Sequence, residues 1–185
     1  MSNKKKEILG VMIAKKESTR LPGKNLKDFN GMPMFLWNLK KLLDIFETVV
    51  FDSDCENMCE MARKIGAVPN LRDIDLRGND VPSVPLFRSI LDKFPQFDYL
   101  VNVQANSPNT PESVISNCGD IIKLPGINEV LTAYSNRELN GSIWGFSRMR
   151  IENYGDYYVH APDALVLDDS IDIHTIDEFK KSLEQ

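Results

Sequence analysis

The sequence predicts an α/β protein of three layers, αβα, in which a mostly parallel central sheet has helices on both faces. Strand-like and helix-like segments alternate along the whole chain, as they do when crossover helices join parallel strands. The run 98–104 is rich in β-branched and aromatic residues between Pro95 and Pro108, which is typical of a central strand. A length of 185 residues with 42% apolar content suits a single domain with a sizeable core.

The elements in chain order follow from the spacing of apolar residues. Strands are expected at 8–14, 48–51, 66–69, 98–104, 129–134 and 163–168. Helices are expected at 34–43, 56–65, 84–94, 111–123 and after Thr175. Thr175 and Glu178 have the spacing of a capping box, and Pro33 suits the first turn of the helix that follows it. Phe35 and Trp37 are expected in the core. Residues 71–82 are polar without a pattern and predict a loop.

The first strand leads into a basic loop. Between residues 15 and 27 there are five positive side chains and one negative, a local charge of 5 − 1 = +4 in a chain of formal net charge -5. Such a loop at the carboxyl end of a first strand is a usual place for a phosphorylated ligand. Pro22 and Gly23 would hold Arg20 and Lys24 in fixed directions. Neither the P-loop nor the G-x-G-x-x-G pattern is present, so a solvated basic loop is the alternative.

Two further polar segments follow predicted strands. Gln104-Ala105-Asn106-Ser107-Pro108 comes at the carboxyl end of the central strand, where buried polar groups need partners. A turn before the next helix is the alternative interpretation. Asp52-Ser53-Asp54 ends the second strand, and Asp54 stands where a helix N-cap is expected.

Several of these segments resemble one family. Ser18-Thr19-Arg20-Leu21-Pro22-Gly23-Lys24 resembles the signature loop of sugar-acid cytidylyltransferases, and 24–27 with Gly31-x-Pro33 resembles the acylneuraminate branch. Residues 104–108 resemble Q-P-T-S-P of that branch, whereas 101–104 with Pro108 resemble V-N-V-Q-G-D-E-P of the 3-deoxy-manno-octulosonate branch. Residues 140–144 resemble N-G-A-I-Y, a strand under the sugar, and the family reads D-I-D-T at 172–175.

The resemblance implies a Rossmann-like, GT-A-like nucleotidyltransferase fold, with residues 1–185 as a single domain. The long segment that precedes N-G-A-I-Y in acylneuraminate enzymes, with sugar contacts and part of the dimer interface, is reduced here to 135–139. The implied activity is transfer of CMP from CTP to a sugar acid or related acceptor, with release of pyrophosphate, for surface glycan biosynthesis. The implied cofactor is Mg²⁺, and a homodimer is compatible with the family.

The same resemblance assigns roles to residues. Arg20 and Lys24 would grip the triphosphate as the catalytic cations, and Asp172 would bind the metal, with a structural cap or an ion pair as its alternative. For Asp54 two interpretations remain, a helix cap and a nucleotide contact. The remaining nucleotide-binding residues are expected to be Ala14, Lys15, Ser18, Asn25, Ser53, Asp54, Gln104, Asn106 and Ser107.

Three positions depart from the family pattern. His174 replaces the second aspartate of D-I-D, and Asn106 stands where the octulosonate branch has its other metal-binding aspartate. Asp172 is then the only recognisable metal carboxylate, and histidine is a poor Mg²⁺ ligand. Thr110 replaces an arginine of the acylneuraminate motif, so a sugar carboxylate would lose a partner. Arg88, Arg137 and Arg148 are cations that could substitute for it.

Composition excludes some classes of function. The acidic balance argues against general nucleic-acid binding, and no apolar stretch is long enough to span a membrane. Three cysteines without metal spacing indicate free thiols in the cytoplasm, and two histidines make zinc unlikely. Two other functions remain open: a nucleotide-binding homologue that has lost its metal site and catalysis, and a nucleotidyltransferase that uses another base.

Overall fold

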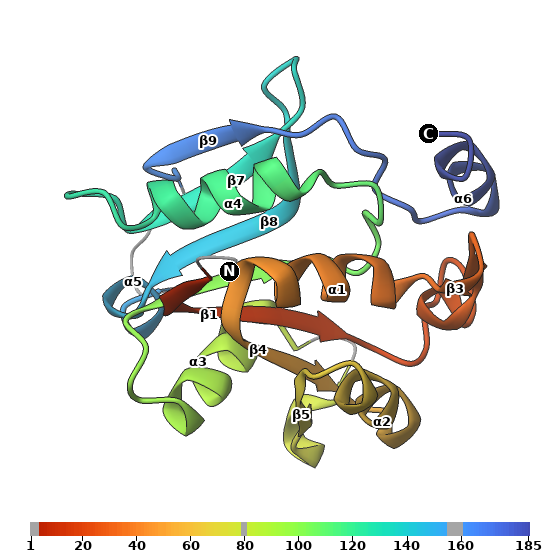
Figure 1. Cartoon of the computed structure of the whole chain (residues 1–185), viewed down its shortest axis with the longest axis horizontal. Helices are drawn as coiled ribbons and strands as arrows, with labels where there is room; N and C mark the ends of the chain where they lie inside the picture. The colour runs from red at the N-terminus through yellow and green to blue at the C-terminus, as the bar shows by residue number, and fades with distance from the viewer. Residues whose placement is uncertain (1–3, 79–80, 155–160) are drawn as a thin grey trace.

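A seven-stranded sheet forms the centre of the computed structural model, which describes residues 4–78, 81–154 and 161–185 (Figure 1). Its order is β5-β4-β1-β6-β8-β7-β9. The strands are β1 (Lys5–Ala14), β4 (Phe46–Ser53), β5 (Val68–Leu71), β6 (Tyr99–Val103), β7 (Glu129–Ala133), β8 (Leu139–Ser147) and β9 (Ala164–Leu167). β8 runs antiparallel to β6 and β7, and the other pairs are parallel. The predicted mostly parallel sheet is confirmed.

Helices cover both faces of this sheet, as predicted. The helices are α1 (Phe35–Ile45), α2 (Glu56–Lys64), α3 (Ser83–Lys93), α4 (Glu112–Ile121), α5 (Arg148–Glu152) and α6 (Ile176–Ser182). One apolar cluster joins α1, α2 and α4 to the sheet, and a second joins α3 and α5 to the opposite face. None of the helices in the described ranges is long and apolar enough to cross a membrane.

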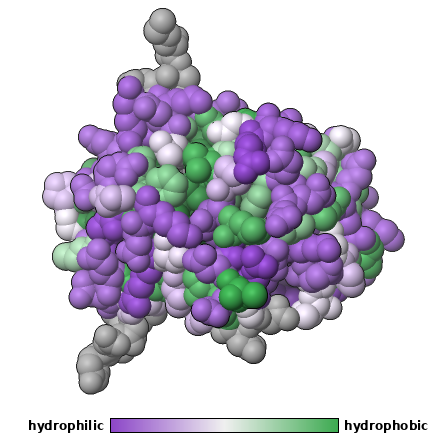
Figure 2. Space-filling view, turned by 90° about the horizontal axis from the view of Figure 1, so that it is seen from below, coloured by the Kyte–Doolittle hydropathy of each residue, from purple (hydrophilic) through white to green (hydrophobic). Residues whose placement is uncertain are grey.

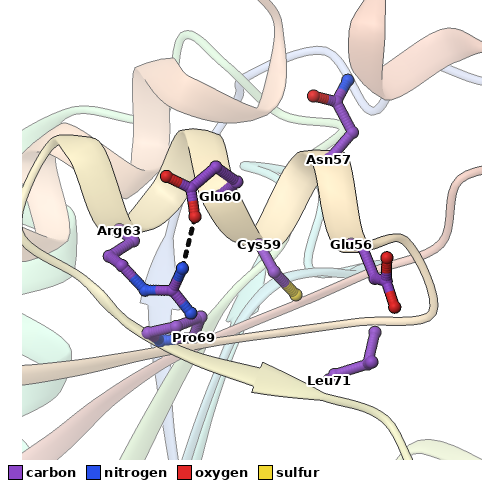
Figure 3. A pocket seen from close by; sticks show the side chains of 7 residues that line it. All are labelled: Glu56, Asn57, Cys59, Glu60, Arg63, Pro69 and Leu71. Carbon is purple, nitrogen blue, oxygen red and sulfur yellow. Dashed lines mark hydrogen bonds and ion pairs between the residues drawn. The ribbon is translucent and has the colours of Figure 1, made fainter.

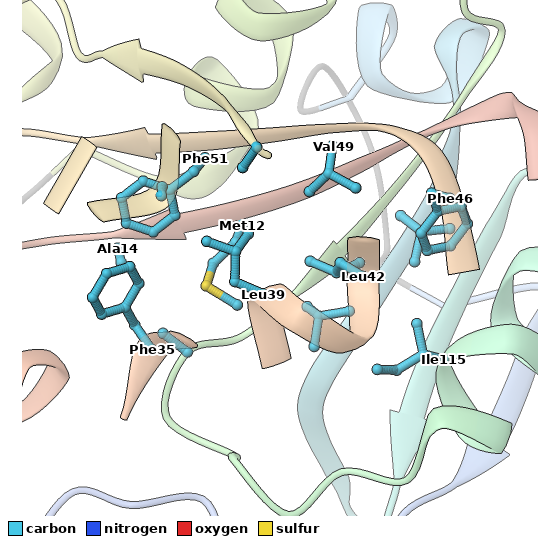
Figure 4. Packing of buried hydrophobic residues seen from close by; sticks show 14 of the residues in the cluster. Met12, Ala14, Phe35, Leu39, Leu42, Phe46, Val49, Phe51 and Ile115 are labelled. Atoms are coloured by element: carbon cyan, nitrogen blue, oxygen red, sulfur yellow. The ribbon is translucent and has the colours of Figure 1, made fainter. Parts of the chain in front are cut away.

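The first cluster explains why the amphipathic segment after Pro33 folds as a helix on the sheet. Phe35 and Leu39 of α1 are fully buried, and they face Met12 of β1 and Phe51 of β4 (Figure 4). The Phe35 and Phe51 rings lie 5.0 Å apart between centroids. Burying side chains of this size contributes about 1.5–3 kcal/mol each. The prediction that Phe35 is a core residue is confirmed.

Some predicted boundaries were wrong, for local reasons. Gly66 adopts a left-handed φ of 104° and turns the chain after α2, so the third strand begins at Val68 and not at residue 66. Pro33 lies in a short strand, and the helix begins two residues later. The predicted loop at 71–82 contains a 3-10 turn, Ile74–Leu76. The sequence did not predict α5, a single helical turn that begins where β8 ends.

A satellite core lies at one end of the sheet. A second sheet pairs β2 (Asp28–Phe29) with β3 (Met32–Pro33), and α6 lies beside it (Figure 1). The Phe29 and Phe179 rings pack edge to face with centroids 5.6 Å apart. The cluster also contains Ile173, Leu21 and Met34. Trp37 packs against it, and the Nε1 atom of Trp37 donates a hydrogen bond to the Phe29 carbonyl at 2.7 Å. The cluster fastens the C-terminal helix onto the basic loop.

A buried ion pair joins the ends of β4 and β5. Arg72 and Asp52 are each 2% exposed, and Arg72 Nε donates to Asp52 Oδ1 at 2.6 Å. Asn70 Nδ2 donates to Asp52 Oδ2 at 2.7 Å. Burial raises the pKa of Asp52, although Arg72 beside it acts in the opposite direction. Removing one member of such a pair leaves the other charge buried without compensation.

This pair makes the first testable prediction. Asp52→Ala should lower the free energy of unfolding by about 3–5 kcal/mol, because the Arg72 guanidinium would stay buried without its carboxylate. Urea denaturation followed by circular dichroism measures the change.

Glu60→Ala is the matched control, because Glu60 pairs with Arg63 on the exposed surface of α2. This change should cost less than about 1 kcal/mol. Equal losses for the two variants would contradict the structural role of the buried pair.

Candidate functional site

A cleft of about 330 Å³ lies at the carboxyl ends of β1 and β6. In a parallel α/β sheet this edge is where ligands bind. The residues that line it come from the basic loop, the end of β6 and the segment before α6. They are Ile13, Ala14, Lys15, Glu17, Ser18, Thr19, Arg20, Lys24, Asn25, Gln104, Ala105, Asn106 and His174.

The basic loop has an ordered backbone. Gly23 adopts the left-handed conformation, φ 64° and ψ 17°, as the N-cap of the turn Lys24–Leu26. Leu21 N–H donates to Ser18 Oγ at 3.3 Å, and Asn25 Nδ2 donates to the Lys15 carbonyl at 2.8 Å. The loop is therefore closed on itself by its own side chains. Gly23 thus takes a backbone conformation that glycine adopts without strain.

Lys24 joins this loop to the C-terminal segment. Its side chain reaches inward, it is 8% exposed, and its Nζ donates to the Ile173 carbonyl at 2.7 Å. Burial lowers the pKa of Lys24, and the nearby carboxylate of Asp172 offsets part of this effect. An ammonium in this position is held in place at the wall of the cleft.

Asp172 lies between two partners at the same wall. Asn106 Nδ2 donates to Asp172 Oδ1, and Asp172 Oδ2 lies 2.7 Å from His174 Nε2. Ile173 N–H donates to the Asn106 carbonyl at 2.8 Å, which ties the two segments together through the backbone.

The predicted capping box of α6 is confirmed, with Thr175 and Glu178 in reciprocal contact. Glu178 also accepts from His174 N–H at 2.8 Å, which fixes the backbone at His174.

Eight of the predicted site residues line this one cleft. They are Ala14, Lys15, Ser18, Arg20, Lys24, Asn25, Gln104 and Asn106. Asp172 is not part of the lining, but it contacts Asn106 and His174, which are. The Asn25 Oδ1 atom is buried and has no hydrogen-bond partner among the described residues.

Besides Asp172, three predicted nucleotide-binding residues lie outside the lining. Ser53 is fully buried, and its Oγ accepts from Cys55 N–H at 3.2 Å. Ser107 is also fully buried, and its carbonyl accepts from Asn38 Nδ2 at 2.7 Å. Asp54 does not cap α2, because the N-cap is Cys55, whose side chain makes no cap bond. Its Oδ1 instead accepts from Lys16 N–H at 2.8 Å and holds the start of the basic loop.

The sequence did not predict four of the lining residues, Ile13, Glu17, Thr19 and Ala105, and it treated His174 only as a lost metal ligand. The three proposed substitute arginines do not gather here. Arg88 and Arg148 donate to backbone carbonyls on the α3 and α5 side. Arg137 lies in the turn before β8 with a left-handed φ of 70°. Thr110 is fully buried and donates to Asp168 Oδ2 at 3.1 Å.

A larger pocket of about 600 Å³ lies elsewhere, between α2 and the edge strand β5 (Figure 3). Cys59 and Glu56 point into it, and the Glu60–Arg63 ion pair lies along its rim. Figure 2 shows a mainly hydrophilic face with small, separate hydrophobic spots. We assign the site to the smaller cleft because polar groups from three distant segments converge there.

Comparison with known proteins gives the same family as the motifs. Residues 10–123 match the family described as Cytidylyltransferase. The CMP-N,N'-diacetyllegionaminic acid synthase of Legionella pneumophila is 27% identical, over 91% of each chain. The pseudaminic acid cytidylyltransferase of Campylobacter jejuni is 33% identical over 45% of this chain and 38% of the relative. The N-acylneuraminate cytidylyltransferase A of Danio rerio is 24% identical over 70% of this chain and 30% of the relative. The chain thus spans less than half the length of the latter two.

Solved structures share the fold. A structure of CMP:2-keto-3-deoxy-manno-octonic acid synthetase complexed with CTP has a TM-score of 0.78 at 13% identity, covering 96% of this chain and 97% of that one. Rv0371c from Mycobacterium tuberculosis, in a complex with manganese, has a TM-score of 0.71 at 17% identity, covering 97% and 99%. At these identities the likeness concerns the fold, and it confirms the predicted Rossmann-like αβα arrangement.

The satellite core makes a prediction about the site. Phe179→Ala should loosen α6 from the basic loop, because Phe179 packs on Phe29 and beside Ile173. Hydrogen exchange followed by mass spectrometry should show faster exchange at 18–27 and 171–185, with β1 and β6 unchanged. Faster exchange throughout the sheet would contradict a separate docking unit.

Proposed function

This chain belongs to the cytidylyltransferase family, and we propose that it transfers CMP from CTP to a sugar acid or a related acceptor, with release of pyrophosphate. The observation that carries the proposal is the convergence of Arg20, Lys24 and Gln104 in one cleft, with Asp172 beside it. These residues come from three segments far apart in the sequence. Their meeting at the carboxyl edge of the sheet is what a nucleotide site requires.

The reaction moves one cytidylyl group. An acceptor hydroxyl oxygen forms a bond to the α-phosphorus of CTP while the bond from that phosphorus to the α–β bridging oxygen breaks. The hydroxyl proton passes to water, and pyrophosphate carries away the electron pair of the broken bond. Negative charge spreads over the phosphoryl and bridging oxygens in the transition state, so fixed cations are the groups that accelerate this step.

Lys24 and Arg20 supply those cations in the proposal. Lys24 is prepositioned by its bond to the Ile173 carbonyl, so little reorganisation accompanies the reaction. Lys15 also lines the cleft, and its Nζ donates to the Gly78 carbonyl at 2.9 Å. We propose that it touches the triphosphate as a point charge.

The polar side chains at the end of β6 would orient the nucleoside. The Gln104 backbone is fixed on both sides, since its N–H donates to the Ser142 carbonyl at 2.8 Å and its carbonyl accepts from Asn38 Nδ2 at 3.0 Å. Its side chain is thereby presented to the cleft. We propose that Gln104 and Asn25 contact the base or ribose, with Ala14, Ser18 and Asn106 forming the surrounding wall. Ser53, Asp54 and Ser107 would act by supporting this wall.

A divalent ion, Mg²⁺ at cellular concentrations, would accompany the triphosphate. The oxygens of Asp172 and Asn106 are the hard donors that Mg²⁺ accepts. No group of three or more histidine, cysteine or acidic side chains that could hold a metal comes together in the described ranges. The ion would therefore be held by Asp172 and by phosphate oxygens, and it would supply neutralisation of developing charge.

We further propose that residues 1–185 act as one nucleotidyltransferase domain in the cytoplasm. The three cysteines are free and buried, which suits a reducing compartment. The turn between β7 and β8 is tight, with Arg137 N–H donating to the Tyr134 carbonyl at 2.8 Å. Any homodimer would have to form without a long insertion at this point.

Activity tests the central role of Lys24. The protein should release pyrophosphate from CTP and Mg²⁺ with at least one member of a panel of sugar acids and sugar phosphates. Lys24→Met should lower kcat/KM by roughly 10²–10³-fold, because the transition state would lose a fixed cation.

Lys16→Met is the matched control. Lys16 belongs to the same loop, but its side chain is exposed and does not line the cleft. It should keep kcat/KM within about threefold, since an exposed charge contributes little. Binding of CTP without turnover for any acceptor would instead indicate a nucleotide-binding homologue without catalysis.

A series of four nucleotides tests which base the site prefers. In a thermal-shift measurement with Mg²⁺, CTP should raise the Tm of the protein more than UTP, ATP or GTP, because ligands that bind only the native state stabilise it according to their affinity. A larger shift with a purine nucleotide would contradict the assignment to cytidine.

A further inference from the structure

We propose that His174 is a metal-binding residue that makes this site prefer Mn²⁺ to Mg²⁺. The inference deepens the proposed function and rests on it. It starts from the imidazole at the wall of the cleft, which has no part in gripping the triphosphate.

The two donor atoms lie at a distance that suits one ion. His174 Nε2 and Asp172 Oδ2 are 2.7 Å apart. Two neighbouring ligands of an octahedral ion at about 2.1 Å from each stand about 3.0 Å apart. A shift of a few tenths of an ångström would therefore let both atoms bind one ion. An ion bound by both atoms would take the place of the hydrogen bond between them, with His174 Nε2 offering its lone pair.

Neighbouring groups hold Asp172 and the backbone of His174 in position. Asn106 Nδ2 donates to the other carboxylate oxygen, Asp172 Oδ1. The backbone of His174 is fixed by Glu178 and the capping box of α6. The side chains of His174 and Asp172 are 27% and 24% exposed, so the pair is open on one side. Such outer contacts are what orient metal ligands in proteins.

The donor atoms differ in their chemistry. One carboxylate, one imidazole and triphosphate oxygens offer a mixed set of nitrogen and oxygen. Mg²⁺ takes oxygen ligands almost exclusively, whereas first-row transition ions accept imidazole readily. Mn²⁺ shares the octahedral geometry that a triphosphate site requires and gains from the nitrogen.

The site offers little negative charge of its own. Asp172 is a single carboxylate, and Lys24 is close enough for their charges to interact. The electrostatic attraction for any divalent ion is thereby weakened. The binding of Mg²⁺ depends on electrostatic attraction to the carboxylate, so it is weakened. Mn²⁺ regains part of this lost binding free energy through its bond to the imidazole nitrogen.

The experiment measures the ion directly. Mn²⁺ is added to the full chain with protein in excess over CTP and no acceptor, and electron spin-echo envelope modulation is recorded. Coupling to ¹⁴N of an imidazole is expected in the native protein and should vanish in His174→Asp. Mg²⁺ is then added as a competitor, and the signal of free Mn²⁺ reports how much Mn²⁺ it displaces. The ratio of the two affinities, Mn²⁺ over Mg²⁺, should fall on the order of tenfold in His174→Asp.

His160→Asp is the matched control, because it removes the other histidine of the chain and makes the same change of side chain. It should leave both the ¹⁴N coupling and the ion preference unchanged. The inference is overturned if the native complex shows no ¹⁴N coupling, or if His174→Asp leaves the preference unaltered while CTP still raises the Tm; the proposed function then stands. If CTP raises the Tm with neither ion, the proposed function fails and the inference falls with it.

Discussion

The bond from Lys24 Nζ to the Ile173 carbonyl joins two segments that are 149 residues apart in the chain. One segment is the basic loop after β1, and the other carries Asp172 and His174. Because the bond is buried, it is stronger than it would be in water, and losing it would leave a carbonyl unpaired. The satellite core of Phe29, Phe179 and Ile173 packs around the same junction. The proposed phosphate-binding cations and the proposed metal-binding segment of this cytidylyltransferase therefore depend on this junction for their relative position.

The sheet was predictable because its strands and helices carry strong local patterns. The run at 98–104 and the helical spacing around Phe35 identify the central strand and α1 without tertiary information. The sequence did not predict the reversed direction of β8, since alternation of residues is the same in parallel and antiparallel strands. It also did not predict the β2–β3 pair, because two-residue strands have no periodicity to detect.

The site residues were predictable where a sequence motif places them, and less predictable where tertiary packing decides which residues are buried and which partners they contact. Eight of the predicted residues share the cleft, since they follow the ends of β1 and β6. Asp54 has the local sequence of a helix cap, yet it binds Lys16 N–H from another segment. The ion pair of Arg72 and Asp52 joins residues 20 positions apart, with α2 and β5 between them in the sequence. Such contacts depend on the packing of β4 against β5, which no local pattern reports.

A crystal structure with a non-hydrolysable CTP analogue tests the central claim most directly. The account predicts triphosphate oxygens within hydrogen-bonding distance of Lys24 Nζ and the Arg20 guanidinium, with the nucleoside beside Gln104. It also predicts that the bond from Lys24 to Ile173, or the direct contact of the two segments, survives in the complex. A nucleotide bound in the pocket between α2 and β5, or a triphosphate that touches neither cation, would contradict the account.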